Sequence, residues 1–231
     1  MSDPPGPLIG SGRAADVYDL GDGTVVRRYR TPNAGLEREA EVMRYVRSKG
    51  YPAPRVHAVD GRDLVMDKVD GRTMMSRLQD APAKVWTYGR LLARLQAALA
   101  EIPAPDFLMA AGWSAGTDDR VLHLDLHPMN VMIAAGGPVV IDWTNAAGGP
   151  PGFDAAMTYV EMATYEVDGH KERIGRAVLL RRFTRLRGRR LIDSFIGAAC
   201  DHRLADSNTT PGERVAIAEL RTRTAGRERR E

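Results

Sequence analysis

Cysteine is almost absent from the 231-residue chain, which contains only Cys200. One thiol cannot form an intramolecular disulfide or a cysteine-based zinc site, so the composition is that expected of a protein of the reducing cytoplasm. Long apolar runs are also missing, since the longest, Leu91–Ala100, is interrupted by Arg94 and Gln96. The segment Met1–Pro7 is acidic and proline-rich. We therefore expect a cytoplasmic protein with neither a signal peptide nor a membrane span.

Aromatic residues make up only 6% of the chain, but 43% of its residues are hydrophobic and 27% are charged. These proportions suit a folded core and exclude disorder, collagen and a coiled coil as descriptions of the whole chain. The formal net charge of +3 is small. It fits a phosphate-binding enzyme as well as a nucleic-acid binder.

Residues 8–69 have the pattern of a small, strand-rich unit. The turn residues Gly21–Gly23 separate two strand-like segments, which is typical of a hairpin. Apolar residues recur at helical spacing over 36–48 and are followed by Gly50, which predicts one helix in this unit. The expected strands cover residues 8–18, 24–30, 56–59 and 64–69.

From residue 70 onward the chain is predicted to be mainly helical. A long helix is expected over 83–102, because apolar residues recur at helical spacing until Pro103. Several helices should follow over 153–225, and the charged tail, about 221–231, is expected to be frayed. The three tryptophans, Trp86, Trp113 and Trp143, are expected to be packing residues.

The most informative segment is His123–Asn130, which follows the spacing His-x-Asp-Leu-x-x-x-Asn. Two short apolar runs separated by Gly136-Gly137 come next and predict a hairpin, at whose end lies Asp142. Phosphoryl transfer from ATP needs a carboxylate beside the reacting hydroxyl, and an asparagine and a second aspartate that converge on magnesium. The spacing is therefore that of a kinase catalytic loop followed by a magnesium-binding aspartate.

A glycine-rich segment precedes the catalytic segment in the order expected of a kinase. Gly10 and Gly12 lie between strand-like segments, as a phosphate-binding loop does, with Ala15 in place of a third glycine. A plain hairpin turn would explain these glycines equally well on their own. The downstream motifs therefore favour the phosphate-loop interpretation.

Arg27 occupies the strand position at which kinases carry a phosphate-binding lysine. Because side chains alternate along a strand, Arg27 should share a face with Val25, and Arg28 should point to the opposite face. On that face the Arg27 guanidinium can pair with Glu39 of the following helix and reach nucleotide phosphates.

Taken together, these motifs resemble the aminoglycoside phosphotransferase and choline kinase-like family, small-molecule relatives of the protein kinases. The typical loop of that family reads His-Gly-Asp-Leu-His-Pro-Gly-Asn, and the similarity covers roughly residues 9–154. It implies an α+β, two-lobed protein kinase-like fold. Residues 1–69 would form a small antiparallel-sheet lobe with one helix that binds nucleotide, and residues 70–231 a mainly helical lobe for catalysis and substrate binding.

The resemblance also implies an activity, its cofactors and its residues. The enzyme would use ATP and Mg²⁺ and transfer the γ-phosphate to a hydroxyl of a small molecule such as an aminoglycoside antibiotic. Asp125 would be the catalytic base, and Asn130 and Asp142 would be the magnesium ligands. The nucleotide would be bound by Gly10, Gly12, Arg27 with Glu39, and the backbone of Asp67 and Val69, which lie in the linker between the lobes.

Three features depart from the family pattern. Leu124 and Met129 replace the two glycines of the loop, which could alter how closely substrate approaches the backbone. Arg27 replaces the lysine, and a planar guanidinium is not equivalent to a compact ammonium group, so we expect slow turnover. The C-terminal part is also short, so helices that would build the acceptor pocket should be trimmed.

Other functions compete with this interpretation. His123, Asp125 and His127 alternate and could face one metal ion, as in a hydrolase, although we favour His123 as a residue that supports the loop. A binding module would keep the kinase-like fold and bind nucleotide or a small molecule with little transfer. A protein Ser/Thr kinase is disfavoured, because Asp142-Trp-Thr replaces Asp-Phe-Gly. Asp154 is expected to be a helix N-cap or loop anchor.

The acceptor is left open by the charges near the end of the chain. Residues 173–190 carry eight arginines, which we interpret as a solvated helix face beside a core stripe, so we do not expect a nucleic-acid partner. If acidic residues line the acceptor pocket, a polycationic acceptor is expected, and if the arginines do, a neutral or anionic alcohol is. The acidic candidates are Glu161, Glu166, Asp168 and Glu172.

Overall fold

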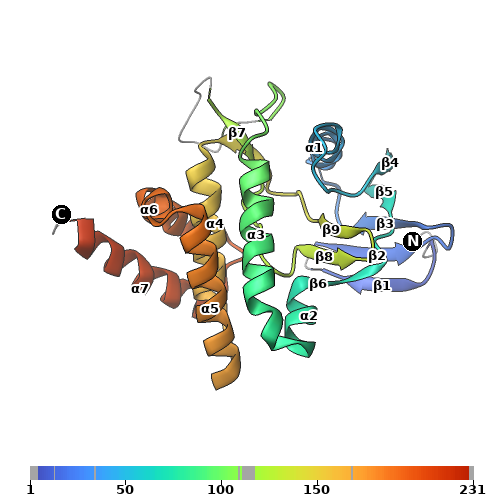
Figure 1. Ribbon diagram of the computed structural model, residues 1–231. Coiled ribbons are helices and arrows are strands. Elements are labelled where there is room, and N and C mark those ends of the chain that lie inside the picture. The colour runs from blue at the N-terminus through green and yellow to red at the C-terminus, as the bar shows by residue number, and fades with distance from the viewer. Residues whose placement is uncertain are drawn as a thin grey trace. The chain divides into compact units, whose positions relative to one another are not determined.

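The computed structural model describes residues 5–228 except 13, 34, 109, 111–117 and 168, with side chains described up to residue 224 (Figure 1). The chain divides into two compact units. The first contains residues 1–73 and 131–146, and the second contains residues 74–130 and 147–231. The hairpin that follows the His123–Asn130 segment therefore groups with the N-terminal residues, and the lobe boundary expected after residue 69 stays a prediction.

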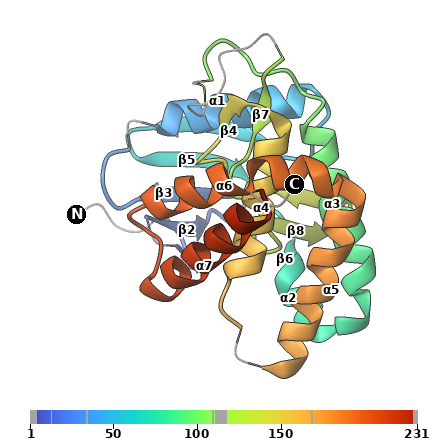
Figure 2. The same ribbon diagram turned by 90° about the vertical axis from the view of Figure 1, so that its left-hand side faces the viewer.

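The first unit is built on a five-stranded antiparallel sheet with the strand order β1-β2-β3-β5-β4. Helix α1, Leu36–Ser48, packs beside β4 and buries one face that includes Ala40, Met43 and Val46 (Figure 2). The helix ends at the positions predicted from the apolar spacing, and Gly50 follows with φ of 81°. The strands are β1 Leu8–Ser11, β2 Ala15–Asp19, β3 Thr24–Tyr29, β4 Val56–Asp60 and β5 Asp63–Asp67.

A second sheet of the same unit contains the predicted hairpin. Strands β8, Val131–Ala134, and β9, Gly137–Val140, pair antiparallel, and β6, Gly71–Thr73, adds to the β8 edge. The backbone N–H of Val140 donates to the Pro52 carbonyl at 2.7 Å, and the Trp143 ring meets Tyr51 edge-on at 5.6 Å between centroids. These contacts anchor the segment that carries Asp142 within the first unit.

The second unit is mainly helical. Helices α4 and α6 pack against each other, with the Phe153 ring edge-on to those of Phe195 and His202, and α3 runs beside α5 (Figures 1 and 2). At this second contact a Cβ on Gly89 would lie 3.0 Å from the Arg182 Cβ, so a larger residue at position 89 would require Arg182 to shift by a few tenths of an ångström. Two short strands pair antiparallel, β7 Arg120–Leu122 and β10 Ala147–Gly149. The helices are α2 Met74–Asp80, η1 Pro82–Lys84, α3 Val85–Leu99, α4 Pro151–Thr164, α5 His170–Arg187, α6 Arg189–Ala205 and α7 Pro211–Glu228.

The predicted fold class is confirmed: the protein is α+β, with an antiparallel sheet and one helix in its N-terminal part and a mainly helical C-terminal part. Helix α7 continues to Glu228, past Arg221, where the sequence predicted fraying. No helix of the described residues is long and apolar enough to cross a membrane.

The side-chain expectations for the C-terminal helices are met only in part. Leu179 and Phe183 are buried as the predicted core stripe of α5, but Ile174 and Leu186 are exposed. Trp143 is buried, as a packing residue should be. Trp86, in contrast, is 54% exposed, with the Arg182 guanidinium 5.5 Å from its ring centroid, and Trp113 lies outside the described residues.

Candidate active site

The alternation of β3 places Arg27 on the face predicted from the sequence. Its Nη1 donates to Glu39 Oε1 at 2.8 Å and its Nη2 donates to Asp142 Oδ1 at 3.0 Å, so one guanidinium bridges two carboxylates. Arg28 points to the opposite face, where it makes two hydrogen bonds to Asp63, at 2.8 and 2.6 Å. The structure therefore brings Arg27, Glu39 and Asp142 together in the first unit, and we call these three residues the arginine cluster.

Burial controls the electrostatics of this cluster. Glu39 is only 3% exposed, and burial raises the pKa of its carboxyl group, an effect that the nearby Arg27 charge opposes. Burial also raises the pKa of the Tyr29 hydroxyl to about 12. Tyr29 is thus protonated at neutral pH and donates to Glu39 Oε2 at 2.6 Å. An arginine remains charged in such a setting, so the buried carboxylate keeps a permanent partner.

Asp142 is the exposed end of the cluster. Its backbone has φ of 64°, in the left-handed region, and its side chain is 38% exposed. Oδ1 accepts hydrogen bonds from Arg27 and from the Thr144 hydroxyl, the latter at 2.7 Å. A partly exposed carboxylate held in this way is a suitable oxygen donor for a hard cation.

The glycine-rich segment forms the turn between β1 and β2. The Gly12 N–H donates to the Ala15 carbonyl at 2.8 Å and closes the turn, while residue 13 lies outside the described residues. A Cβ on Gly10 would lie 3.7 Å from Val17, which is ordinary van der Waals contact. Neighbouring atoms therefore do not require glycine at position 10, and its expected role toward phosphate stays a prediction.

The predicted adenine-binding segment follows β5. The Asp67 N–H already donates to the Arg55 carbonyl at 2.9 Å, and the Asp67 carboxylate lies 2.7 Å from His57 Nε2. Any adenine contact of the Asp67 backbone must therefore use its carbonyl group. Val69 lies just beyond the strand and is half-buried.

In the second unit, the polar residues of His123–Asn130 gather around Asp125. Asn130 Nδ2 donates to the Asp125 backbone carbonyl at 2.9 Å and to its Oδ2 at 3.0 Å, and His127 Nε2 lies 3.3 Å from Oδ1. Both Asp125 atoms that face the Asn130 amide are acceptors, so the NH₂ group must point toward them. The Asn130 Oδ1 is then the atom that can face a cation.

The backbone of this loop is held by a buried carboxylate. Asp154 of α4 is 1% exposed, and its Oδ1 accepts from the N–H groups of Leu124 at 2.7 Å and His123 at 3.1 Å. Leu124 has φ of 63°, a conformation that glycine adopts without strain, which explains why the family carries glycine there. Asp154 therefore acts as the loop anchor, the second of the two roles expected for it.

His123 supports the loop and is not placed as a metal ligand. It is fully buried, and its Nδ1 accepts from the Asp125 N–H at 3.3 Å. Among the residues that the structure describes, no group of three or more His, Cys, Asp or Glu side chains could hold a metal ion. The arrangement needed by the hydrolase alternative, with His123, Asp125 and His127 on one ion, is thus not formed.

One carboxylate near Asp125 has an altered acidity. Burial raises the pKa of Glu161 in α4 to about 7, a shift that Arg203 opposes and Asp125 increases. Arg203 Nε lies 2.5 Å from Glu161 Oε1 but without hydrogen-bond geometry, and Arg203 also binds Asp206 at 2.9 Å. Two carboxylates therefore share one arginine.

Of the other acidic candidates, Glu166 and Glu172 are exposed and Asp168 lies outside the described residues.

The residues present fit a magnesium ion. Carboxylate and amide oxygens are the ligands that Mg²⁺ prefers, and it commonly takes one or two protein ligands together with phosphate oxygens of a nucleotide. Asp142 and Asn130 each carry such an oxygen. When bound, Mg²⁺ would neutralise charge on the phosphates.

Comparisons with known proteins decide the family. The sequence profile of the phosphotransferase enzyme family (APH) matches residues 6–120 and 108–191. The chain belongs to this family. The predicted resemblance to aminoglycoside phosphotransferases is thereby confirmed, and the protein is a phosphotransferase. No curated protein matches the chain in sequence.

Solved structures share the phosphotransferase fold at low sequence identity. A ternary complex of a thermostable APH(4)-Ia variant with ADP and hygromycin B has a TM-score of 0.65 at 17% identity, covering 94% of this chain and 93% of that one. The gentamicin complex of APH(2″)-IIa has a TM-score of 0.62 at 13% identity, and the match covers 85% of this chain and 81% of that one. ADP-bound APH(2″)-Ib has a TM-score of 0.61 at 12% identity, and the match covers 92% of this chain and 90% of that one. At these identities the likeness shows the fold alone.

Sequence reasoning missed two residues that bind the arginine cluster. Tyr29 donates to Glu39 and Thr144 donates to Asp142, so both fix its carboxylates. Glu161, in contrast, was named from the sequence as an acidic candidate, and it lies in the electrostatic surroundings of Asp125. The position of Thr144 two residues after Asp142 was a usable signal, because a hydroxyl at that spacing can bond the preceding carboxylate.

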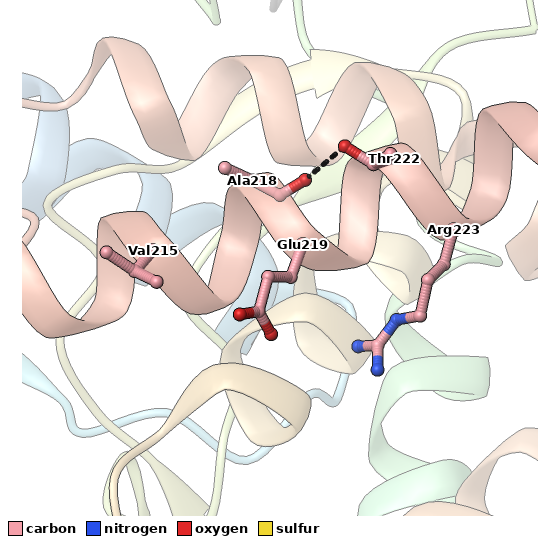
Figure 3. Close-up of a pocket in the computed structure, with 5 residues that line it drawn as sticks. All are labelled: Val215, Ala218, Glu219, Thr222 and Arg223. Carbon is pink, nitrogen blue, oxygen red and sulfur yellow. Dashed lines mark hydrogen bonds between the residues drawn. The ribbon is translucent and has the colours of Figure 1, made fainter.

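A shallow hollow lies along α7, and the described residues that line it all belong to that helix (Figure 3). The hydroxyl of Thr222 donates to the Ala218 carbonyl at 2.9 Å within it. None of its lining residues belongs to the phosphotransferase motifs. The lining residues are Val215, Ala218, Glu219, Thr222 and Arg223.

Proposed function

We propose that this phosphotransferase uses ATP and Mg²⁺ to phosphorylate a hydroxyl group of a small molecule. The observation that carries the proposal is the geometry around Asp125. Asn130 and His127 hold the carboxylate at 3.0 and 3.3 Å, and the side chain remains 25% exposed, so it is oriented and still accessible to a substrate hydroxyl. A positioned carboxylate of this kind is what a kinase uses to orient its nucleophile.

In the proposed reaction, Asp125 accepts the proton of the acceptor hydroxyl as its oxygen attacks the γ-phosphorus of ATP. The new bond joins that oxygen to phosphorus, the bond from phosphorus to the β–γ bridging oxygen breaks, and ADP leaves. Arg27, kept charged and fixed by Glu39, would orient the phosphates, and Asn130 and Asp142 would hold Mg²⁺. Gly10, Gly12, Asp67 and Val69 would complete the nucleotide site.

The acceptor follows from the charge near Asp125. Glu161 interacts electrostatically with Arg203, Asp125, His127 and Glu213, so this group contains three carboxyl groups beside one arginine and one histidine. This acidic environment favours a cationic acceptor over an anionic one. Aminoglycosides, which carry several amines and hydroxyls, are therefore the first acceptors to test, and antibiotic modification is the corresponding biological role.

The test is a screen of aminoglycosides, other antibiotics and metabolite alcohols for mass gain of one phosphoryl group with ATP and Mg²⁺. Asp125→Asn should lose the transfer, while Asp193→Asn, at an exposed α6 position, should keep it. Nucleotide binding without transfer to any acceptor would contradict the proposal and favour the binding module. Transfer by Asp125→Asn at the wild-type rate would remove Asp125 from its role.

A further inference from the structure

The guanidinium of Arg27 is bound by four side chains of the first unit. Nη1 donates to Glu39 Oε1 at 2.8 Å, and Nη2 donates to Asp142 Oδ1 at 3.0 Å and to Thr144 Oγ1 at 3.3 Å. The Tyr29 ring lies beneath, with its centroid 5.1 Å from the guanidinium carbon. The contacts therefore use two separate nitrogens and one face of the planar group.

Tyr29 and Thr144 also fix the two carboxylates that receive Arg27. Tyr29 donates to the second oxygen of Glu39 at 2.6 Å, so both oxygens of that buried group are bonded. Thr144 donates to Asp142 Oδ1 at 2.7 Å, and its oxygen lies 3.4 Å from the Tyr29 hydroxyl. The two hydroxyls therefore lie next to each other, each donating to a different carboxylate of the arginine cluster.

A lysine could not make the same set of contacts. Its ammonium group is a single compact charge without the planar fork that places two nitrogens on different carboxylates, and it does not stack on a ring as a guanidinium does. We propose that Tyr29 and Thr144 are positioning residues that make this site specific for arginine at position 27. The part of this inference that concerns nucleotide rests on the proposed function.

The functional test measures binding of ATP with Mg²⁺ by calorimetry. We expect Arg27→Lys to bind about tenfold more weakly, although the family carries lysine there, since hydrogen bonds between charged groups are lost. Thr144→Val should weaken binding by a smaller factor, and Thr144→Ser, which keeps the hydroxyl, should restore it. Tyr29→Phe tests the other positioning residue. Thr222→Val on α7 removes an exposed helical hydroxyl and is the matched control.

A double-mutant cycle separates positioning from a general loss of stability. Arg27→Lys should weaken binding less in the Thr144→Val background than in the wild type, because residues of one network are not additive. Full additivity, or wild-type binding by Arg27→Lys, would overturn the inference.

Failure of the proposed function would be seen separately, as a wild-type protein that binds no nucleotide. In that case the same double-mutant cycle is measured by urea unfolding. Non-additive shifts of the unfolding midpoint for Arg27→Lys and Thr144→Val would support the inference, and additive shifts would overturn it.

Discussion

The arginine cluster and the loop around Asp125 are stabilised in different ways. In the arginine cluster, charged side chains from three separate segments bind one another, and the hydroxyls of Tyr29 and Thr144 bind its two carboxylates. In the loop, one buried carboxylate, Asp154, binds backbone N–H groups and fixes a left-handed residue. The first arrangement depends on which side chains are present, whereas the second depends on the path of the backbone. Substitutions should therefore change binding at the cluster, and both turnover and folding at the loop.

The largest effect is expected at Asp125, the only residue assigned to proton transfer. Asp125→Ala should reduce the turnover number by about 10²–10⁴-fold, because positioned acid–base groups contribute that much. Nucleotide affinity should stay nearly unchanged, since Asp125 would not contact the nucleotide in the ground state. Steady-state kinetics together with calorimetry check both parts. A parallel loss of affinity and turnover would show that the loop, and not the proton transfer, had been damaged.

The next effect concerns the loop anchor. Asp154→Ala leaves the N–H groups of His123 and Leu124 without their buried acceptor. Because each unsatisfied buried group costs about 1–3 kcal/mol, the free energy of unfolding should fall by about 4 kcal/mol. Urea unfolding measures this change. Asp16 provides the control. It is half-buried and binds the side chains of Ser11 and Arg30 near the surface, so its removal should change stability little. Equal losses for the two variants would contradict the anchoring role.

Glu161 predicts a pH dependence of stability. Its pKa is about 7 in the folded protein and near 4.5 in the unfolded chain, so between these values the folded state binds more protons. Its stabilising contribution is complete below about pH 4.5 and is lost as the pH rises through 7. The difference in free energy of unfolding between Glu161→Gln and the wild type should therefore change in favour of the variant by on the order of 3 kcal/mol from pH 5 to pH 8. Denaturant unfolding across this range is the measurement.

The charged neighbours that set this response are Arg203, Asp125, His127 and Glu213. Glu219→Gln, at an exposed position of α7, is the matched control and should leave the pH profile unchanged. If the wild type and Glu161→Gln show the same pH profile, Glu161 is ionised in the folded protein at an ordinary pH.

The smallest effect isolates the strain at Leu124. Its side chain is buried, so both Leu124→Ala and Leu124→Gly should lose core packing to a similar extent. At φ of 63°, however, glycine avoids the clash of a Cβ. The glycine variant should therefore be more stable than the alanine variant by about 1 kcal/mol, the reverse of the usual order. Thermal unfolding of the two variants measures this difference. Gly50 also has a positive φ, of 81°, so Gly50→Ala should destabilise the protein for the same reason.

The motifs that could be predicted from the sequence are those whose partners lie close in the chain. Asn130 and His127 are within five residues of Asp125, so their spacing alone places them beside it. Strand alternation likewise predicted that Arg27 and Arg28 face opposite ways, because the period of a strand is a local property. The ends of α1 were predictable for the same reason, since apolar spacing and Gly50 mark them.

Contacts across long sequence separations were decided only by the tertiary structure. Arg27 and Asp142 are 115 residues apart, and Leu124 and Asp154 are 30 apart, so no local pattern announces either pair. Whether Ile174 and Trp86 are buried likewise depends on which neighbours pack over them. Apolar spacing placed Ile174 in the core stripe of α5, and the usual burial of aromatic residues predicted Trp86 as a packing residue, but both side chains are exposed. By itself the sequence determined the family and the order of the motifs, and it supplied the residues that we propose for phosphoryl transfer. Only the fold decided which side chains bind Arg27 and that Asp154 holds Leu124 in the left-handed conformation. Both features depend on side chains brought together from distant segments.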